Sequence, residues 1–246
     1  ARYGGAIENW GELQLDYSTL ANNKALVGDG GGLWVVGGDA DITYSTIRNN
    51  ESKTTGGGIS CYGNSLSVIH STINNNTSGT EGAGIYSTCN VNLTNSTLSG
   101  NKAPSAGGGG IFQKSSGTAT LSYVTIANNS ATFGAGVNND GAGNSALTIE
   151  KSILANNSTG NCDGVVTSLG YNLASDNNCG DFTKTGDQKN VTLALGALSN
   201  NGGATATLLP LTGNPAINHI PAASCGFSTD QRDIARPQGT NCDSGA

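Results

Sequence analysis

The sequence predicts an all-β chain: a right-handed parallel β-helix with about 26 residues per coil and an irregular, disulfide-containing C-terminal cap. Three observations lead to this prediction. They are a repeat of about 26 residues, an alternation of apolar and polar residues with period two, and a change of composition after residue 157. Stacked short units bury a continuous core that no single unit could form alone.

The repeat is visible as three columns of residues. Aliphatic residues that follow a small residue and a glycine recur every 26 positions, at Ile7, Leu33, Ile59, Ile85, Ile111 and Val137. A second aliphatic column runs through Leu20, Ile47, Ile73, Leu98, Ile126 and Leu154. Three residues after each of these stands an asparagine, at Asn23, Asn50, Asn76, Asn101, Asn129 and Asn157.

Each unit is expected to hold three short strands separated by Gly or Asn turns. Apolar residues alternate with polar ones between the two aliphatic columns, as in Leu66 and Val68, and no window keeps a helical period. The Gly or Ala pairs before the first column, such as Gly31-Gly32, are expected to supply the unusual φ and close approach of a corner.

Polar columns fill the remaining positions of the repeat. Since Leu20 and its equivalents face inward, alternation places a serine column inside and a threonine column outside. The serines are Ser18, Ser45, Ser71, Ser96 and Ser152, and the threonines are Thr19, Thr46, Thr72, Thr97 and Thr125. The stacked asparagines are expected to bond the neighbouring coil as an asparagine ladder, which satisfies turn groups that burial would leave unpaired.

The 26-residue repeat ends after Asn157. We therefore divide one continuous domain into six coils over 1–157 and irregular last coils with a cap over 158–246. The six cysteines suggest disulfides and an oxidising compartment, because their spacing closes short loops. The expected pairs are Cys162 with Cys179, Cys225 with Cys242, and Cys61 with Cys89. Metal binding is the competing interpretation for these cysteines, but there is no CxxC.

Composition narrows the function classes. Only 11% of the residues are charged, against ~25% in an ordinary domain, and the formal net charge is −6. An acidic chain is a poor partner for nucleic acid or an anionic membrane, and no apolar run is long enough to span a bilayer. His70 and His219 are far from a ligand spacing, so we predict no metal, although a structural Ca²⁺ is possible, and no cofactor.

The repeats and the C-terminal motifs resemble known bacterial surface proteins. Gly4-Gly5-Ala6-Ile7 and its equivalents, alternating with aliphatic-x-x-Asn, resemble the repeats of polymorphic outer membrane proteins. The C-terminal part resembles the choice-of-anchor surface proteins through Gly170-Tyr171-Asn172-Leu173, Ser175-Asp176, Cys179-Gly180, Asn201-Gly202-Gly203, Pro215-Ala216-Ile217, Asp230-Gln231-Arg232, Arg236-Pro237, Cys242-Asp243 and Gly245-Ala246. This resemblance implies an exported β-helix whose precursor ends in a variable anchor beyond Ala246, and it implies no reaction. One departure is Asp233, where such proteins usually carry Gly.

An enzyme is the serious alternative, because parallel β-helices also host polysaccharide lyases and glycosidases. A glycosidase needs two carboxylates about 5–9.5 Å apart in a cleft, and the best candidate pair is Asp39 and Asp41, two positions apart on one strand face. A lyase would need Lys or Arg as base, and Arg48 and Lys151 are isolated. We therefore predict no catalytic residues.

Three other features could carry binding. Asp230, Arg232, Arg236 and Asp243 form the densest charged cluster, which we interpret as a salt-bridged part of the cap that satisfies backbone groups of the last coil, with ligand or metal binding as the alternative. An outward column with Tyr17, Tyr44 and Tyr123 could stack sugars, since aromatic faces suit carbohydrate rings. The threonine column could form an ice-binding surface, which needs a regular hydroxyl and methyl array.

The function expected from the sequence is therefore a non-catalytic, extracellular or cell-surface protein. It would serve as a rigid rod in adhesion, matrix building or fibre assembly. Its partners would be surface or matrix glycans or proteins, or further copies of itself. The last possibility follows because the first coil begins at Gly4 without a preceding capping segment, and an exposed strand end favours head-to-tail pairing. The alternative is that an N-terminal segment outside this sequence covers that end.

Overall fold

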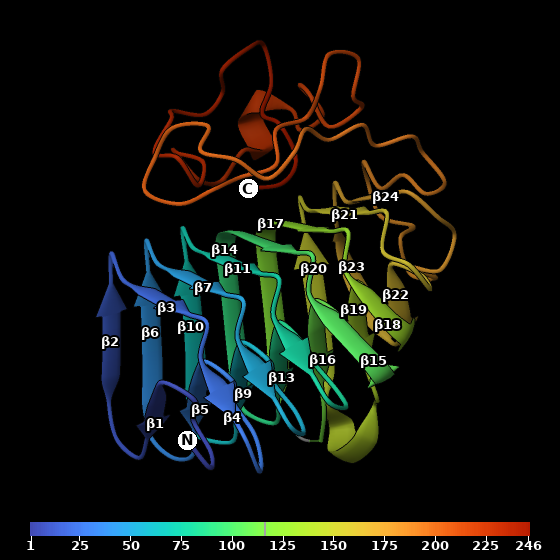
Figure 1. Cartoon of the computed structure of the whole chain (residues 1–246). Helices are drawn as coiled ribbons and strands as arrows, with labels where there is room; N and C mark the ends of the chain where they lie inside the picture. The colour runs from blue at the N-terminus through green and yellow to red at the C-terminus, as the bar shows by residue number, and fades with distance from the viewer. Residues whose placement is uncertain (116) are drawn as a thin grey trace.

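The computed structural model describes residues 1–115 and 117–246 and shows a parallel β-solenoid with a C-terminal segment folded back along it (Figure 1). The solenoid has about six turns that are ~26 residues apart, as predicted. Within these described residues, no helix is long and apolar enough to cross a membrane.

The first sheet carries the first aliphatic column. Its strands, in spatial order, are β1 (Ile7–Asn9), β5 (Leu33–Val35), β9 (Ile59–Cys61), β13 (Ile85–Ser87), β16 (Ile111–Gln113), β19 (Val137–Asn139) and β22 (Cys162–Gly164). All neighbours are parallel and in register, so that Ile59 lies opposite Leu33 on one side and Ile85 on the other. The column predicted to point inward is fully buried from Leu33 to Val137.

The second sheet runs in two lanes that meet at a corner. The first lane contains β2 (Leu13–Asp16), β6 (Asp39–Thr43), β10 (Ser65–Ile69), β14 (Asn90–Ser99), β17 (Thr118–Ala127), β20 (Ala146–Glu150) and β23 (Val166–Gly170). The second lane contains β3 (Thr19–Ala21), β7 (Thr46–Arg48), β11 (Thr72–Asn74), β21 (Ile153–Ala155) and β24 (Leu173–Ala174). Strands β14 and β17 pass through the corner and belong to both lanes.

A third, shorter sheet closes the coil, and two 3₁₀ turns lie outside the sheets. The strands are β4 (Lys24–Ala25), β8 (Glu51–Ser52), β12 (Thr77–Ser78), β15 (Lys102–Gly107) and β18 (Ser130–Phe133). The 3₁₀ turns are η1 (Ala142–Asn144) and η2 (Ala222–Ser224).

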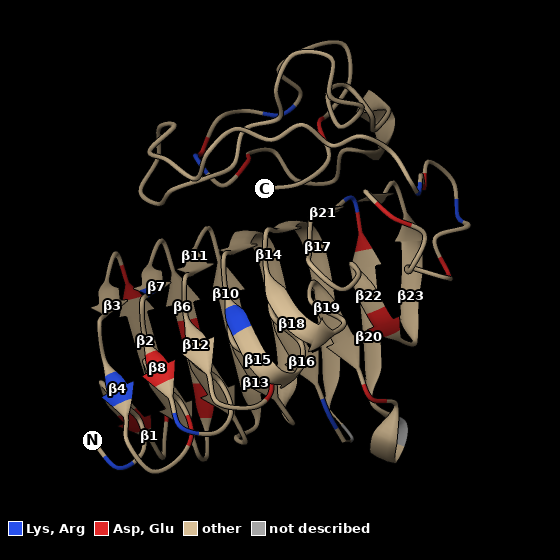
Figure 2. Ribbon diagram, turned by 45° about the vertical axis from the view of Figure 1, so that its right-hand side comes forward, with Lys and Arg blue, Asp and Glu red and all other residues tan. Residues whose placement is uncertain are grey.

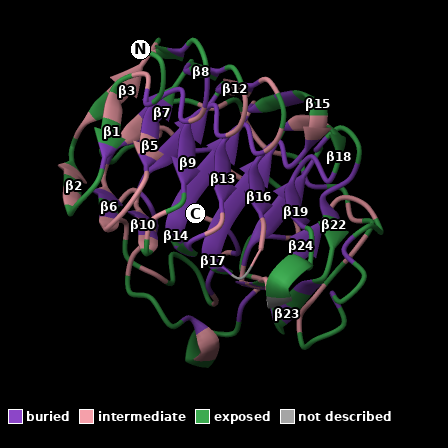
Figure 3. Ribbon diagram, turned by 90° about the horizontal axis from the view of Figure 1, so that it is seen from below, coloured by how far each residue is buried: buried purple, intermediate pink, exposed green. Residues whose placement is uncertain are grey.

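The core is a thin column of aliphatic side chains enclosed by the sheets. Burial of one such Leu, Ile or Val stabilises the fold by about 1.5–3 kcal/mol, and the repeat multiplies this contribution coil by coil. Figure 3 shows the buried strands in the middle of the solenoid. Ile7, Leu13, Leu15 and Leu20 of the first coil pack against this core but are only partly buried.

The asparagine ladder is confirmed over its whole predicted length. From Asn23 to Asn129 the amide Nδ2 and the backbone N–H of one asparagine donate to Oδ1 of the next. From Asn50 to Asn157 the amide Nδ2 also donates to a carbonyl of the previous coil. Asn76, for example, donates to Asn101 Oδ1 at 3.0 Å and to the Ile47 carbonyl at 2.9 Å. After Asn157 the ladder ends on Asn161, whose Oδ1 lies 2.8 Å from the Asn157 amide.

The serine column forms a second, simpler ladder at the corner of the second sheet. The backbone N–H of Ser45 donates to Ser71 Oγ at 3.0 Å, and that of Ser71 donates to Ser96 Oγ at 3.2 Å. These serines are buried, as alternation predicts.

The prediction about the corner glycines is wrong in one detail. Positive φ belongs to the residue before each Gly or Ala pair, such as Gly56 at +61°. The pair itself provides the close approach: a Cβ on Gly31 would lie 2.2 Å from the carbonyl oxygen of Gly57 on the next coil. The two demands of the corner, conformation and closeness, are therefore divided between neighbouring residues.

The region after residue 157 differs from a simple end cap. Strands β22 to β24 add a further, less regular coil. Phe182 and the Cys162–Cys179 disulfide then join the core cluster at the C-terminal end of the solenoid. Residues 190–246, here called the return segment, do not stay at that end. They run back along the corner of the second sheet (Figure 1).

All three predicted disulfides are present in the described structure: Cys61–Cys89, Cys162–Cys179 and Cys225–Cys242. Cys61 and Cys89 bridge adjacent coils, with their Cα atoms 5.8 Å apart. Three disulfides indicate a non-reducing environment.

Candidate functional site

The outward face of the first lane of the second sheet is mostly polar. Because strand residues alternate, Leu66 and Val68 point into the core while Ser65, Ser67 and Ile69 point outward. Two outward columns run along the solenoid axis in exact register. One contains Gln14, Asp41, Ser67, Asn92, Thr120 and Thr148, and the other contains Asp16, Thr43, Ile69, Thr94, Ser122 and Glu150. We call this surface of β2, β6, β10, β14, β17 and β20 the polar face.

Three hollows of the described structure adjoin one another on the polar face: the first lies over β2, β6 and β10, and the second and third lie side by side over β10, β14 and β17, with the third reaching β20. The first is lined by Gln14, Asp16, Asp41, Thr43, Ser67 and Ile69. The second is lined by Ser65, Leu66, Ser67, Asn90, Val91, Asn92, Thr118 and Thr120. The third is lined by Ile69, His70, Asn92, Thr94, Asn95, Thr120, Ser122, Glu150, Phe227, Ser228 and Thr229. Most side chains that line these hollows are small and carry hydroxyl or amide groups, so they do not fill the space.

The return segment forms one wall of the third hollow and is fixed there by Gln231. This side chain is fully buried. Its Oε1 accepts a hydrogen bond from Thr97 Oγ1 at 2.7 Å, and its Nε2 donates to Thr72 Oγ1 at 2.9 Å and to Thr205 Oγ1 at 2.8 Å. A single glutamine thus joins two coils of the solenoid to two distant parts of the return segment.

The wall continues at Phe227 and Thr229. The Thr229 carbonyl accepts a hydrogen bond from Asn95 Nδ2 at 3.1 Å. Phe227 packs edge-on against Tyr123, with ring centroids 5.7 Å apart, yet remains 41% exposed. Phe227 thus presents a held aromatic ring beside the polar face.

The predicted tyrosine column is only partly a surface. Tyr17 is 71% exposed and stacks on Tyr44 at 4.8 Å, and Tyr44 in turn packs against His70. Tyr123 contradicts the prediction, because the return segment buries it completely and its hydroxyl donates to the Cys225 carbonyl. Burial raises the pKa of Tyr123.

The return segment also covers part of the threonine column, the candidate ice-binding surface. Thr72, Thr97 and Thr125 do point outward, but the return segment covers them and hydrogen-bonds to them. The column therefore does not form the exposed, regular array that an ice-binding surface requires.

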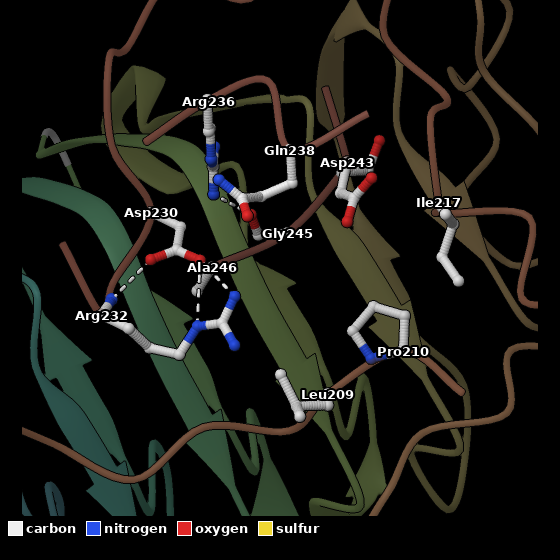
Figure 4. Close-up of a pocket in the computed structure, with 11 residues that line it drawn as sticks. Leu209, Pro210, Ile217, Asp230, Arg232, Arg236, Gln238, Asp243, Gly245 and Ala246 are labelled. Atoms are coloured by element: carbon white, nitrogen blue, oxygen red, sulfur yellow. Dashed lines mark hydrogen bonds and ion pairs between the residues drawn. The ribbon is translucent and has the colours of Figure 1, made fainter. Parts of the chain in front are cut away.

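The predicted charged cluster lies within the return segment and lines a small pocket together with Leu209, Pro210 and Ile217 (Figure 4). Asp230 is buried and accepts hydrogen bonds from Arg232 Nε at 2.9 Å and from the Ile234 N–H at 3.1 Å. This pair satisfies a turn of the return segment rather than the backbone of the last coil, which corrects the predicted role.

The other two members of the cluster have separate partners. Arg236 donates to the Gly245 carbonyl at 2.7 Å and lies 3.9 Å from the ring centroid of Tyr123, and burial lowers the pKa of its guanidinium. Asp243 accepts the backbone N–H of Asn218 at 2.7 Å. Asp233, the departure from the surface-protein pattern, keeps a left-handed conformation with φ of +64°.

The sequence interpretation missed a file of aromatic side chains on the outward side of the first sheet. Trp34, Tyr86 and Phe112 each follow a residue of the first aliphatic column, and Tyr3 and Tyr62 pack between or beside them. The position directly after each residue of the first aliphatic column is the sequence signal that could have revealed these aromatic side chains. Tyr86 and Phe112 are buried, so this file mainly stabilises neighbouring coils.

Charged side chains are scattered over the molecule rather than gathered in one site (Figure 2). Asp39, of the best predicted carboxylate pair, accepts a hydrogen bond from Ser65 Oγ at 2.8 Å, whereas Asp41 is exposed in the first hollow. Glu150 in the third hollow is engaged by Ser122 Oγ at 2.8 Å and by Lys151 Nζ at 3.1 Å. The described residues contain no group of three or more His, Cys, Asp or Glu that could hold a metal ion.

Comparison of the chain with protein-family models, with curated proteins and with solved structures gives no match. The resemblance to bacterial surface proteins therefore stays a prediction, and the function has to be argued from the polar face itself.

Proposed function

We propose that this chain is a non-catalytic surface protein of the extracellular space, whose rigid solenoid holds an extended partner of an adhesive surface or matrix along the polar face. The observation that carries the proposal is the set of three adjoining hollows that together extend over the coils from β2 to β20. An extended polymer can lie across successive coils there without any rearrangement of the backbone. The disulfides support an extracellular location, because they persist in oxidising surroundings.

The carboxylate of the third hollow supports binding rather than hydrolysis there. Glu150 already has two partners, Ser122 and Lys151, and its hollow contains no other carboxylate among the described lining residues. General acid and base catalysis of glycoside cleavage uses two carboxylates that flank one bond.

The test measures retention and turnover together. The full chain is run in native gels that contain soluble polysaccharides, and the same mixtures are assayed for new reducing ends and unsaturated products. We expect retardation by at least one polysaccharide without products. Asn92→Trp, which blocks the centre of the polar face, should abolish retardation, whereas Lys102→Trp on the third sheet should not. Product formation would overturn the non-catalytic assignment, and equal retardation of Asn92→Trp would overturn the role of the polar face.

A second candidate function is self-association at the first coil. It is favoured by the partly buried Ile7, Leu13, Leu15 and Leu20, which present apolar surface there. The pairing would be head-to-tail, with this surface set against the C-terminal end of the solenoid of a second copy, where Phe182 and Cys179 pack on the core. Sedimentation at increasing concentration should reveal dimers and longer assemblies, and a monomer at all concentrations would contradict this candidate.

A further inference from the structure

The third hollow has features of a sugar-binding subsite that the other hollows lack. It is the place where the return segment meets the polar face, so that side chains from two distant parts of the chain surround one space. On one side lie the hydroxyls of Thr94, Thr120 and Ser122, and on the other lies the ring of Phe227. We propose that this hollow binds one sugar ring of a neutral polysaccharide, with Phe227 as its stacking platform. This proposal rests on the proposed function and names the ligand class of the same face.

The platform is held in place before any ligand arrives. Phe227 contacts the buried Tyr123, whose hydroxyl is tied to the Cys225 carbonyl, and Cys225 is itself fixed by its disulfide to Cys242. An aromatic ring that is already ordered loses little conformational entropy when a ligand stacks on it. The 41% exposed fraction of Phe227 leaves apolar surface for the C–H groups of a sugar.

The polar groups of the hollow match a ligand rich in hydroxyls. The carboxylate of Glu150 offers acceptors, and the threonine and serine hydroxyls offer both donors and acceptors. Asn95 also lines the hollow. It is 2% exposed, and its buried Oδ1 has no hydrogen-bond partner in the described structure. An unpaired buried acceptor is unfavourable, and a hydroxyl that enters beside Asn95 is a suitable donor for it.

Charge and spacing decide between classes of polysaccharide. The polar face carries Asp16, Asp41 and Glu150, and the cation nearest to Glu150, Lys151, is already paired with it. A chain of uronic acids or sulfated sugars would bring like charges together, whereas a neutral chain would not.

Parallel strands repeat every ~4.8 Å along the axis, a distance comparable to the length of one sugar ring. Successive rings can therefore meet successive coils.

The experiment is affinity electrophoresis and titration calorimetry of the full chain with soluble starch, mixed-linkage β-glucan and galactomannan as neutral probes. Polygalacturonate and alginate serve as acidic probes. We expect at least one neutral probe to bind and the acidic probes to bind more weakly. Phe227→Ala should lower the affinity roughly fivefold to tenfold, which is the scale of one aromatic contact. Phe227→Tyr should keep the wild-type affinity, and Glu150→Gln should lower the affinity less than Phe227→Ala does.

Phe133→Ala is the matched control, because Phe133 on β18 is similarly exposed, at 44%, but lies on the third sheet. Circular dichroism and melting curves verify that each variant is folded. Preferred binding of acidic probes, or neutral binding that Phe227→Ala leaves unchanged, would overturn the subsite while the proposed function stands. Failure of the wild-type chain to bind any probe would overturn both, and degradation of a probe would overturn the non-catalytic assignment alone.

Discussion

The coils and the return segment of this molecule are held together in opposite ways. In the coils the main stabilising contacts are repeated: an aliphatic residue lies on its equivalent, and an asparagine amide bonds the next asparagine. In the return segment each contact occurs once, as with the buried Gln231 or the Asp230–Arg232 pair. The first arrangement distributes stability over many similar rungs, and the second concentrates it in a few side chains. Removing one contact in each region tests this contrast.

The largest effect is expected from a break in the middle of the asparagine ladder. Asn76→Ala leaves the backbone N–H and amide of Asn50 without their acceptor and the Ile47 carbonyl without a donor. Because these groups stay buried, we expect a loss of about 3 kcal/mol or more in the free energy of unfolding. Urea unfolding measures this loss. Asn92→Ala on the polar face is the control. An equal loss of unfolding free energy in both variants would show that a ladder asparagine contributes no more than an asparagine of the polar face.

Repetition also explains how much of the fold could be predicted from the sequence. The register Ile59 to Ile85 and the ladder Asn50 to Asn76 are visible as fixed spacings, because the same contact selects the same residue type in every coil. The position of the return segment follows from single contacts such as Gln231 to Thr97, which leave no periodic trace. Prediction therefore succeeded for the coils and for the disulfides but did not reveal where residues 190–246 lie.

The same reason limited the prediction of the site. Tyr123 belongs by spacing to the same outward column as Tyr17 and Tyr44, and only the return segment, which covers it, makes it different. Phe227 stands outside every repeat, so its meeting with Ser122 and Glu150 could be seen only in three dimensions.

A smaller and more local effect is expected from Gln231→Ala. The hydroxyls of Thr72 and Thr205 keep other acceptors, the carbonyls of Ala206 and His70, whereas Thr97 loses its partner. We therefore expect a loss of about 2 kcal/mol, confined to the return segment. Hydrogen exchange should accelerate in residues 199–246 and remain slow in the coils, with the exposed Gln238→Ala as control. Equal acceleration in both regions would show that the two regions unfold as one unit.

The smallest effect concerns the aromatic file and its response to pH. Burial raises the pKa of Tyr86 to about 12, against 10.0 for an unperturbed tyrosine, because the folded chain disfavours the phenolate. The stabilisation from the neutral phenol is thus complete below pH 10 and is lost as the pH rises through the interval up to 12. At pH 11 the loss amounts to about 1 kcal/mol. Thermal melting between pH 9 and 11 should fall less steeply in Tyr86→Phe, which packs like its neighbour Phe112. The identical slope in both proteins would mean that ionisation of other groups, and not of Tyr86, sets the alkaline limit of the coils.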